Sequence, residues 1–483
     1  MDYVIIGNGI IALTVAFRLS KVVDPSDSIT IIGPDERIGS ATKAAAAMLN
    51  SYGEIEKNTL LTDVGLYHFE LSRKATSMWP QFEREIISSA SEEELNHRVS
   101  PPIVTRRNLD SGTYIINNTA ANDVDDHNFD SIVRALKEFG EHFEFVNPKE
   151  IPNYYPSQRN RATRAILIPS EGWINPNLLL QSLELALLQC RQVKFKNAKV
   201  EKILKTKNHV VGVTLDTAEK LSGDIFLLSN GAAAGEILNL SNLGLNIQPI
   251  FYGVGISLEL KSPGYPLKNC IRTPNRGGTC GVYSVPLYLG PDDAGDHIVV
   301  GASNFLAPEP FFHGRAISVA HLLNSAIHEI NGHFSDAQLV RVNVGWRPTT
   351  QDTQPLLGKT SIENLIIATG TKRDGFHLSP VLSEMITSIM LGESVDQRFE
   401  VFAPERDLIR ELDRAEAISM GVESLMSQHY QHGYQPSSIR MDMDAQVRVT
   451  FRKELEELHD QIRAFDWGIH PELINMYTRG YAK

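Results

Sequence analysis

The first residues whose spacing has a chemical meaning form a glycine turn near the start of the chain. Gly7 and Gly9 follow a short apolar run and open a second apolar stretch that continues to about Ser20. Two glycines at this spacing let a backbone approach a pyrophosphate, and the N-terminus of a following helix offers N–H groups and partial positive charge. Ala12, in the third position of the motif, permits close packing of helix on strand. The turn therefore predicts a dinucleotide site.

This turn needs a βαβ unit to position it. Strands are predicted at residues 2–6 and 29–32, with a helix from residue 10 to about 20 between them. The second strand ends at Gly33-Pro34, so the acid that usually binds the ribose hydroxyls there is missing. Asp35 and Glu36 follow shortly; either they reach the ribose or they are solvated loop charges.

The composition is that of a globular protein and excludes several functions. The 483 residues are 42% hydrophobic and 8% aromatic, which excludes a disordered chain. The 46 Lys+Arg and 58 Asp+Glu give a net charge of −12, which argues against nucleic acid or an anionic membrane as partner. No apolar run reaches the ~18–20 residues of a membrane span. Asp2 replaces the basic start of a signal peptide, so we expect a cytoplasmic protein.

The rest of the chain does not continue as simple βα repeats. The 3 cysteines and 15 histidines show no metal-site spacing, so no metal is expected. Apolar periodicity predicts helices at residues 60–98, 177–190 and 316–330, and two more within 399–483. An acidic tract at residues 117–130 is typical of a surface loop. Long antiparallel strands are expected at residues 251–260, 281–289 and 297–302.

Three further stretches turn this generic fold into a specific resemblance. They run from Ser40 to Leu49, from Asp224 to Ala232, and from Gly345 to Pro380, the last containing Gly-Trp-Arg-Pro-Thr and Arg-Asp-Gly-Phe-His. Together they resemble the D-amino-acid oxidase (DAO) family of FAD-dependent oxidoreductases, and they are most similar to its glycine oxidase and sarcosine oxidase-like members. The resemblance covers roughly residues 2–400, in the family's order and spacing.

The resemblance implies a two-part fold. An α/β FAD-binding Rossmann-type domain (GR2-like) would comprise residues 1–80, 150–245 and 335–398. It would be interleaved with an α+β substrate domain built on an antiparallel sheet, from residues 81–149 and 246–334. Residues 399–483 would form a helical C-terminal extension.

The resemblance also implies non-covalent FAD and a set of residues that bind it. Small side chains from Ala44 to Ala47 would let the isoalloxazine lie against backbone, although a run of alanines is equally typical of a helix. The strand that begins at Val200 would contact the adenine, and the turn at Asn230-Gly231 would lie near the cofactor. The full set is Gly7, Gly9, Ile10, Ile11, Ala12, Gly33, Pro34, Asp35, Ala41, Thr42, Lys43, Ala46, Ala47, Met48, Val200, Asn230, Gly231, Gly370, Asp374, Gly375, Phe376 and Leu378.

Four residues carry the expected chemistry. Arg347 stands where the family's arginine binds the substrate carboxylate, a task that suits a bidentate guanidinium; the alternative is a structural pair with Asp352. Arg373 matches a second arginine near the substrate, or is a surface charge. Tyr283 is either part of a substrate lid or a packed strand residue. His377 either stabilises negative charge on reduced flavin or packs as a neutral residue.

The implied activity is oxidation of the C–N bond of a small amino acid or amine, such as glycine, a D-amino acid or sarcosine. Hydride would pass to flavin N5, with O₂ as the expected acceptor. One alternative is a flavin dehydrogenase for a 2-hydroxy acid, or a tailoring oxidase for a larger amine. Another is a non-catalytic scaffold or partner subunit that retains FAD.

The C-terminal segment has no counterpart in the single-chain oxidases of this family. Its two amphipathic helices must bury their apolar stripes. They either pack on the FAD-binding domain or make a contact with another chain, in a homo-oligomer or a heteromer.

Overall fold

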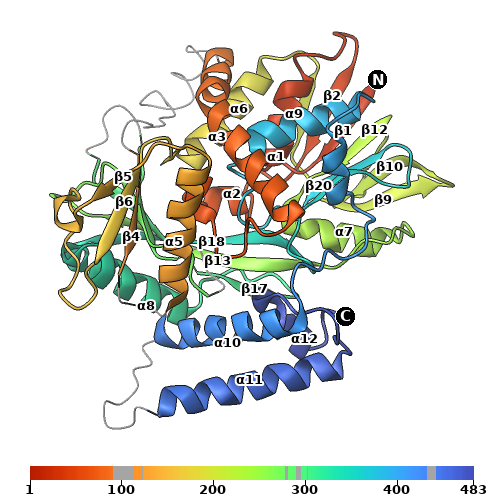
Figure 1. The fold of residues 1–483 in the computed structure, drawn as a ribbon. Helices are drawn as coiled ribbons and strands as arrows, with labels where there is room; N and C mark the ends of the chain where they lie inside the picture. Colours follow the sequence, from red (N-terminus) through yellow and green to blue (C-terminus); the bar gives the residue numbers. More distant parts are fainter. Residues whose placement is uncertain are drawn as a thin grey trace.

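The computed structural model describes residues 1–90, 112–118, 120, 123–277, 281–289, 295–301, 303–431 and 442–483. Two large sheets dominate the fold (Figure 1). The first has six strands, and the second has nine.

The six-stranded sheet is mostly parallel. Its order is β19 (Leu356–Lys359), β20 (Leu365–Thr369), β12 (Ile225–Leu228), β1 (Asp2–Ile6), β2 (Ser28–Ile32) and β8 (Val193–Lys196). Only β19 runs antiparallel to its neighbour. Because the strands are short apolar runs, both faces must be covered.

Side chains alternate between two cores on this sheet. Ile5, Ile31 and Leu227 face a core formed with helices α1 (Ile10–Leu19), α3 (Asp63–Ser89), α6 (Pro176–Leu188) and α9 (Ser379–Met390). Val4 and Phe226 face the opposite core. That core is covered by α7 (Ala234–Ser241) and a small antiparallel sheet of β9 (Val200–Thr206), β10 (His209–Leu215) and β11 (Lys220–Leu221).

The nine-stranded sheet is mostly antiparallel and is built on two long strands. β13 (Ile250–Lys261) pairs with β18 (Gln338–Thr350) along its whole length, and on its other edge with β16 (His297–Gly301) and β17 (Phe305–Ala307). The sheet continues through β15 (Tyr283–Pro286), β14 (Cys270–Arg272), β4 (Thr113–Asn117), β6 (Arg164–Ile168) and β5 (Glu144–Val146). Helices α8 (Ala316–Ser325) and α5 (Asp123–Glu138) cover it.

One local expectation is wrong. The acidic tract predicted as a loop at residues 117–130 contains the last residue of β4 and the first half of α5, while residues 119, 121 and 122 lie outside the described part. The acids that suggested a loop, Asp123, Asp125 and Asp126, lie in the first turn of α5, where negative charge complements the helix dipole. The predicted helix at 316–330 is confirmed over its whole length, as α8 continued directly by a π-helical turn, Ala326–Ile330.

The positions of the strands can be compared with the proposed domain ranges. All strands of the six-stranded sheet fall within the ranges proposed for the FAD-binding domain. β6 and β18 fall in those ranges too, yet they pair within the nine-stranded sheet. The division into domains remains a proposal, and residues 91–111 of its substrate part lie outside the described residues.

The C-terminal extension forms α10 (Arg414–Gln431), α11 (Met443–Gln461), a 3₁₀ turn η7 (Pro471–Leu473) and α12 (Ile474–Thr478). α10 and α11 lie side by side below the rest of the molecule (Figure 1). Leu473 and Met476 are buried against Phe251 of β13 and Leu306 of β17. This part of the extension therefore packs on the nine-stranded sheet. In the part of the chain described, no helix has the length and apolarity to span a membrane.

Candidate functional site

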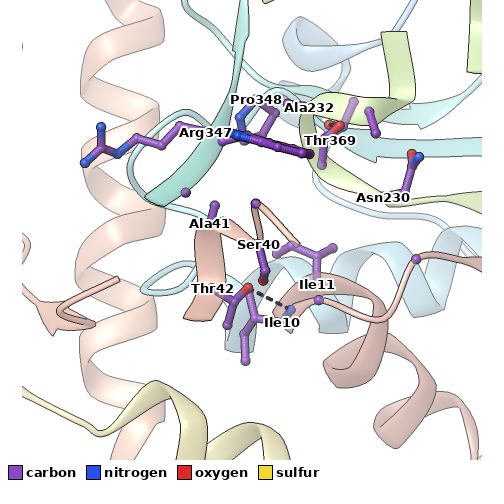
Figure 2. Close-up of a pocket in the computed structure, with 18 of the residues that line it drawn as sticks. Ile10, Ile11, Ser40, Ala41, Thr42, Asn230, Ala232, Arg347, Pro348 and Thr369 are labelled. Carbon is purple, nitrogen blue, oxygen red and sulfur yellow. Dashed lines mark hydrogen bonds between the residues drawn. The ribbon is translucent and has the colours of Figure 1, made fainter. Parts of the chain in front are cut away.

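A cavity of about 590 Å³ lies where the two sheets meet. Its walls include the turns that follow β1, β2 and β12, which is the end of a parallel sheet where ligands bind. From the nine-stranded sheet come residues of β13, β15 and β18. Figure 2 shows open space between Arg347, Pro348 and Thr369 on one side and Ser40–Thr42 with Ile10 and Ile11 on the other.

The glycine turn after β1 forms one wall of this cavity. Gly7 has φ +124°, and a Cβ there would lie 2.5 Å from the carbonyl oxygen of Ser229, so only glycine fits. Gly9 precedes α1 and provides no side-chain cap. The Ile10 N–H donates to Thr42 Oγ1 at 3.2 Å (Figure 2). The other early N–H groups of α1 have no intrahelical acceptor, and Ile11 also lines the cavity. This wall suits a pyrophosphate.

The packing at the end of β2 explains why Gly33 stands where a ribose-binding acid is usual. A Cβ on Gly33 would lie 2.4 Å from Cγ of Asn8, so the Asn8 side chain fills that space. Asn8 Nδ2 donates to the carbonyl oxygen of Pro34 at 2.9 Å. Asp35 is exposed and bonds Asn197, and it does not line the cavity; nor does Glu36. Of the two open alternatives, the geometry favours solvated loop charges.

The alanine run does not continue as a helix. α2 (Ala41–Ala44) ends at Ala45, which is extended, and Ala47 is left-handed with φ +48°. The chain then forms β3 (Met48–Leu49), paired with β7 (Gly172–Trp173). A Cβ on Gly345 of β18 would lie 2.8 Å from Cβ of Ala44, so small side chains are needed here for α2 to reach the second sheet. Ala45, Ala46 and Ala47 line the cavity, outside any helix.

Most of the predicted cofactor residues meet at this cavity, and five do not. Ala12 is fully buried in α1, Leu378 is buried in the core, and Asp35 and Lys43 are exposed. Gly370 (φ +74°) makes the turn after β20 behind the wall. Those on the wall are Gly7, Gly9, Ile10, Ile11, Gly33, Pro34, Ala41, Thr42, Ala46, Ala47, Met48, Val200, Asn230, Gly231, Asp374, Gly375 and Phe376.

Two buried amides on the wall indicate that the cavity takes a polar ligand. Asn50 is 2% exposed, and both atoms of its amide lack a hydrogen-bond partner among the described residues. Asn230 Oδ1 is buried and equally unpartnered within that part of the chain. Buried polar atoms are rarely left unsatisfied. A bound molecule with donors and acceptors would satisfy them, as FAD would, so the wall fits this cofactor.

Arg347 lies on β18 and crosses to the neighbouring strand. A Cβ on Gly255 of β13 would lie 2.4 Å from the guanidinium carbon, so the side chain lies directly over that glycine. Nη1 donates to the Ser303 carbonyl at 3.0 Å and to Asn304 Oδ1 at 3.3 Å. Among the described residues Arg347 has no acidic partner, because Asp352 pairs with Arg406 at 2.8 Å. The proposed structural pair with Asp352 is therefore absent.

Two other cations on the cavity wall, Lys372 and Arg373, are paired with acids. Arg373 contacts Glu56 at 3.3 Å and Glu472 at 3.9 Å, and Lys372 contacts Glu472 at 2.8 Å. Arg373 is only 14% exposed, so it is not a surface charge. Glu54, also on the wall, pairs with buried Arg272 at 2.5 Å. Burial would raise the pKa of Glu54, but Arg272 and Arg373 outweigh it and hold that pKa below its usual value.

Tyr283 and His377 also reach the wall. The Tyr283 ring covers Gly301 of the adjacent strand, where a Cβ would lie 2.2 Å from the phenol oxygen. His377 Nδ1 is 3.0 Å from the carbonyl oxygen of Asn50, so Nδ1 carries the proton and donates. Its Nε2 lies 2.9 Å from Thr76 Oγ1. With both nitrogens engaged inside the protein, the geometry favours the packed role for His377.

Several wall residues were not predicted from the sequence. Lys372, adjacent to Arg373, is not among the site residues predicted from the sequence. Asn8 was visible inside the glycine turn, and Asn50 directly after the alanine run, but only the fold shows what each side chain faces. Trp346 precedes Arg347, and its ring lies over Gly39, where a Cβ would be 2.2 Å away.

Comparisons with known proteins show the family to which the chain belongs. The model of the family "FAD dependent oxidoreductase" (DAO) matches residues 2–389, so the chain belongs to that family. Glycine oxidase of Geobacillus kaustophilus is 23% identical over 83% of this chain and 94% of its own length. The bifunctional protein ThiO/ThiG of Synechocystis is 27% identical over 50% of this chain. The chain covers only 34% of that relative's length.

Solved structures show the same fold. The crystal structure of the Geobacillus kaustophilus glycine oxidase superposes with a TM-score of 0.66 at 21% identity, covering 84% of this chain and 99% of that one. Iminodiacetate oxidase from Chelativorans gives 0.64 at 20% identity, covering 83% and 98%. The family match ends at residue 389, before the C-terminal helices begin.

Proposed function

We propose that this FAD-dependent oxidoreductase oxidises the C–N bond of a small amino acid or amine whose carboxylate binds to Arg347. The observation that carries the proposal is the state of Arg347: it lies on the cavity wall without an acidic partner among the described residues. A guanidinium held by neutral acceptors keeps its charge for an incoming anion. Glycine, D-amino acids and sarcosine-like amines are the proposed substrate class.

The protein's part is to hold and orient the reactants. The turn after β1, the Ala45–Ala47 backbone, Asn50 and Asn230 would hold FAD, which supplies the acceptor for the two electrons removed from the substrate. Arg347 would fix the carboxylate end, which places Cα at a defined distance from the cofactor wall. Tyr283, which lines the cavity and is only 5% exposed, would exclude water from it. Oxidation of a neutral amine by hydride loss needs no side-chain base at Cα, and none is assigned.

The finer terms of the proposal are O₂ as acceptor, non-covalent FAD, a cytoplasmic enzyme, and a homo-oligomer formed through the C-terminal helices. Two alternatives keep specific support. A dehydrogenase is supported by the likeness to the Vibrio vulnificus D-amino acid dehydrogenase, which is 23% identical over 55% of this chain. Because Arg347 would bind any carboxylate, a 2-hydroxy acid fits the same clamp.

The test begins with the purified protein and its visible spectrum. Anaerobic titration with glycine, D-amino acids, N-methylated amino acids and 2-hydroxy acids should bleach the flavin with one of the amines. Peroxide release, compared with reduction of an artificial acceptor, separates oxidase from dehydrogenase. A yellow protein that no amine or hydroxy acid reduces would overturn the proposal in favour of a scaffold that retains FAD.

A further inference from the structure

We propose that Glu472, from the C-terminal extension, is a specificity-determining residue that occupies the place of a second substrate carboxylate between Lys372 and Arg373. The inference rests on the proposed function, because it concerns the same cavity and the same carboxylate clamp. It assigns the extension, which lies outside the family match, a place in the substrate site.

The contacts of Glu472 are those of a bound anion. Its Oε1 is 2.8 Å from Lys372 Nζ and 3.9 Å from an Arg373 nitrogen. Its Oε2 accepts a hydrogen bond from Asn304 Nδ2 at 3.0 Å. The carboxylate side chain is only 5% exposed, while Lys372 and Arg373 both line the cavity. A carboxylate in this position neutralises cations that would otherwise face the substrate.

The same carboxylate also orients the clamp. Asn304 Nδ2 donates a hydrogen bond to Glu472, and Asn304 Oδ1 accepts one from Arg347 Nη1 at 3.3 Å. An amide whose N–H₂ is held by a carboxylate must turn its oxygen the other way. Glu472 therefore acts on Arg347 through Asn304 and positions the guanidinium without touching it.

The local charges keep Glu472 ionised. Burial would raise the pKa of Glu472, but Lys372 and Arg373 outweigh it and lower that pKa to about 2. His470 is itself neutral, because burial, with Lys372 adding to it, lowers its pKa to about 3. Its Nδ1 accepts from the Glu472 N–H at 3.3 Å and caps η7. Glu472 thus lies in a capped turn, and the next residue, Leu473, anchors that turn by packing against Phe251 and Leu306.

This arrangement predicts a preference for ligands with one carboxylate. Arg347 offers one anion site, and Glu472 already fills the second. A substrate with a further carboxylate near Lys372 would meet a buried negative charge at short range, which is strongly unfavourable. Removing the charge while keeping the shape of the side chain should open that second site.

The experiment compares Glu472→Gln with the wild type and with Glu457→Gln, all loaded with FAD. Glu457 lies on α11 of the same extension, is 58% exposed, and pairs only with Lys453 at 3.7 Å among the described contacts. The dissociation constants of acetate and of malonate are measured by calorimetry or by the change in the flavin spectrum. We expect the preference for acetate over malonate to fall by about tenfold or more in Glu472→Gln alone.

An acetate-to-malonate ratio that is unchanged in Glu472→Gln overturns the inference. If Glu472→Gln does not retain FAD, Glu472→Ala replaces it, and Glu472→Asp should restore the wild-type ratio because it restores the charge. If the wild type binds neither ligand, the carboxylate clamp itself fails, and the proposed function falls together with this inference. If the wild type binds acetate and the ratio alone is unaffected, only this inference falls.

Discussion

Arg347 and Gly255 lie on paired strands, and the guanidinium occupies the space that a side chain on Gly255 would need. A Cβ atom on Gly255 would lie 2.4 Å from Cζ and Nη1 of Arg347 and 2.5 Å from its Nη2. The register of β13 and β18 pairs Gly255 with Gly345 and Gly253 with Arg347, so the arginine reaches diagonally across the ladder. The position of the clamp is thus fixed by a glycine on another strand.

Gly255→Ala should displace the Arg347 side chain and weaken substrate binding. A methyl group must push the guanidinium away from Ser303 and Asn304, so we expect KM to rise by about tenfold or more while FAD is retained. Steady-state kinetics and the visible spectrum check this. Gly332→Ala is the matched control, because its nearest atom would be 3.5 Å away. A Gly255→Ala variant with wild-type KM would show that this packing does not set the clamp.

Gly33→Ala should lower FAD retention, and Asn8→Ala should restore it. The methyl group at position 33 would lie 2.4 Å from Asn8 Cγ, and overpacking of this kind costs on the order of 1–3 kcal/mol. Removing the Asn8 side chain takes away the clash, so the double variant should recover most of the melting temperature and bound flavin. If Gly33→Ala and the double variant lose flavin equally, a clash with Asn8 is not the reason that position 33 requires glycine.

Glu171 should make stability fall as the pH rises. Its Oε1 accepts from the Tyr52 N–H at 2.6 Å and the Gly53 N–H at 3.2 Å, and these hold the turn that carries Glu54. Burial raises the pKa of Glu171 from 4.5 to about 7. Because the folded pKa is raised, the contribution of the buried, protonated carboxyl group to stability is complete below pH 4.5 and is lost as the pH rises through about 7.

Glu171→Gln should therefore raise the melting temperature at pH 8 and leave it nearly unchanged at pH 4.5. The amide oxygen can still accept both N–H groups, and the gain should be on the order of 2 kcal/mol. Thermal melts across this pH range check it, with exposed Glu150→Gln as control. A loss of stability at pH 8 in Glu171→Gln would mean that the carboxylate is needed ionised.

Much of the fold could be predicted because its signals are local. The strand, glycine turn and helix from Asp2 to Leu19 follow each other directly, and the apolar strands of the six-stranded sheet are distinct runs in the sequence. The start of α5 could not be found, because acids at a helix N-terminus resemble those of a loop. The alanine run was ambiguous since its geometry is decided by Gly345, far away in the chain.

The site, too, has parts with a local sequence signal and parts that depend on contacts between distant residues. The glycine turn and the arginine motif could be placed from sequence and resemblance, and the structure brings them to one cavity. Which cation is left without an acid depends on contacts across the chain: Asp352 with Arg406, and Lys372 with Glu472. Such pairings have no local signal, so the sequence could not tell the paired Arg373 from the available Arg347, nor show that Glu472 pairs with Lys372.

The central claim is that Arg347 binds the substrate carboxylate, and the most direct measurement is anaerobic flavin reduction by the preferred amine in wild type, Arg347→Ala and Arg347→Lys. With FAD bound equally in all three, we predict that kcat/KM falls by about 100-fold or more in Arg347→Ala, and less in Arg347→Lys, which keeps the charge but not the bidentate fork. Acetate should protect the wild type from reduction and fail to protect Arg347→Ala. An Arg347→Ala enzyme that is reduced as readily as the wild type would contradict the account.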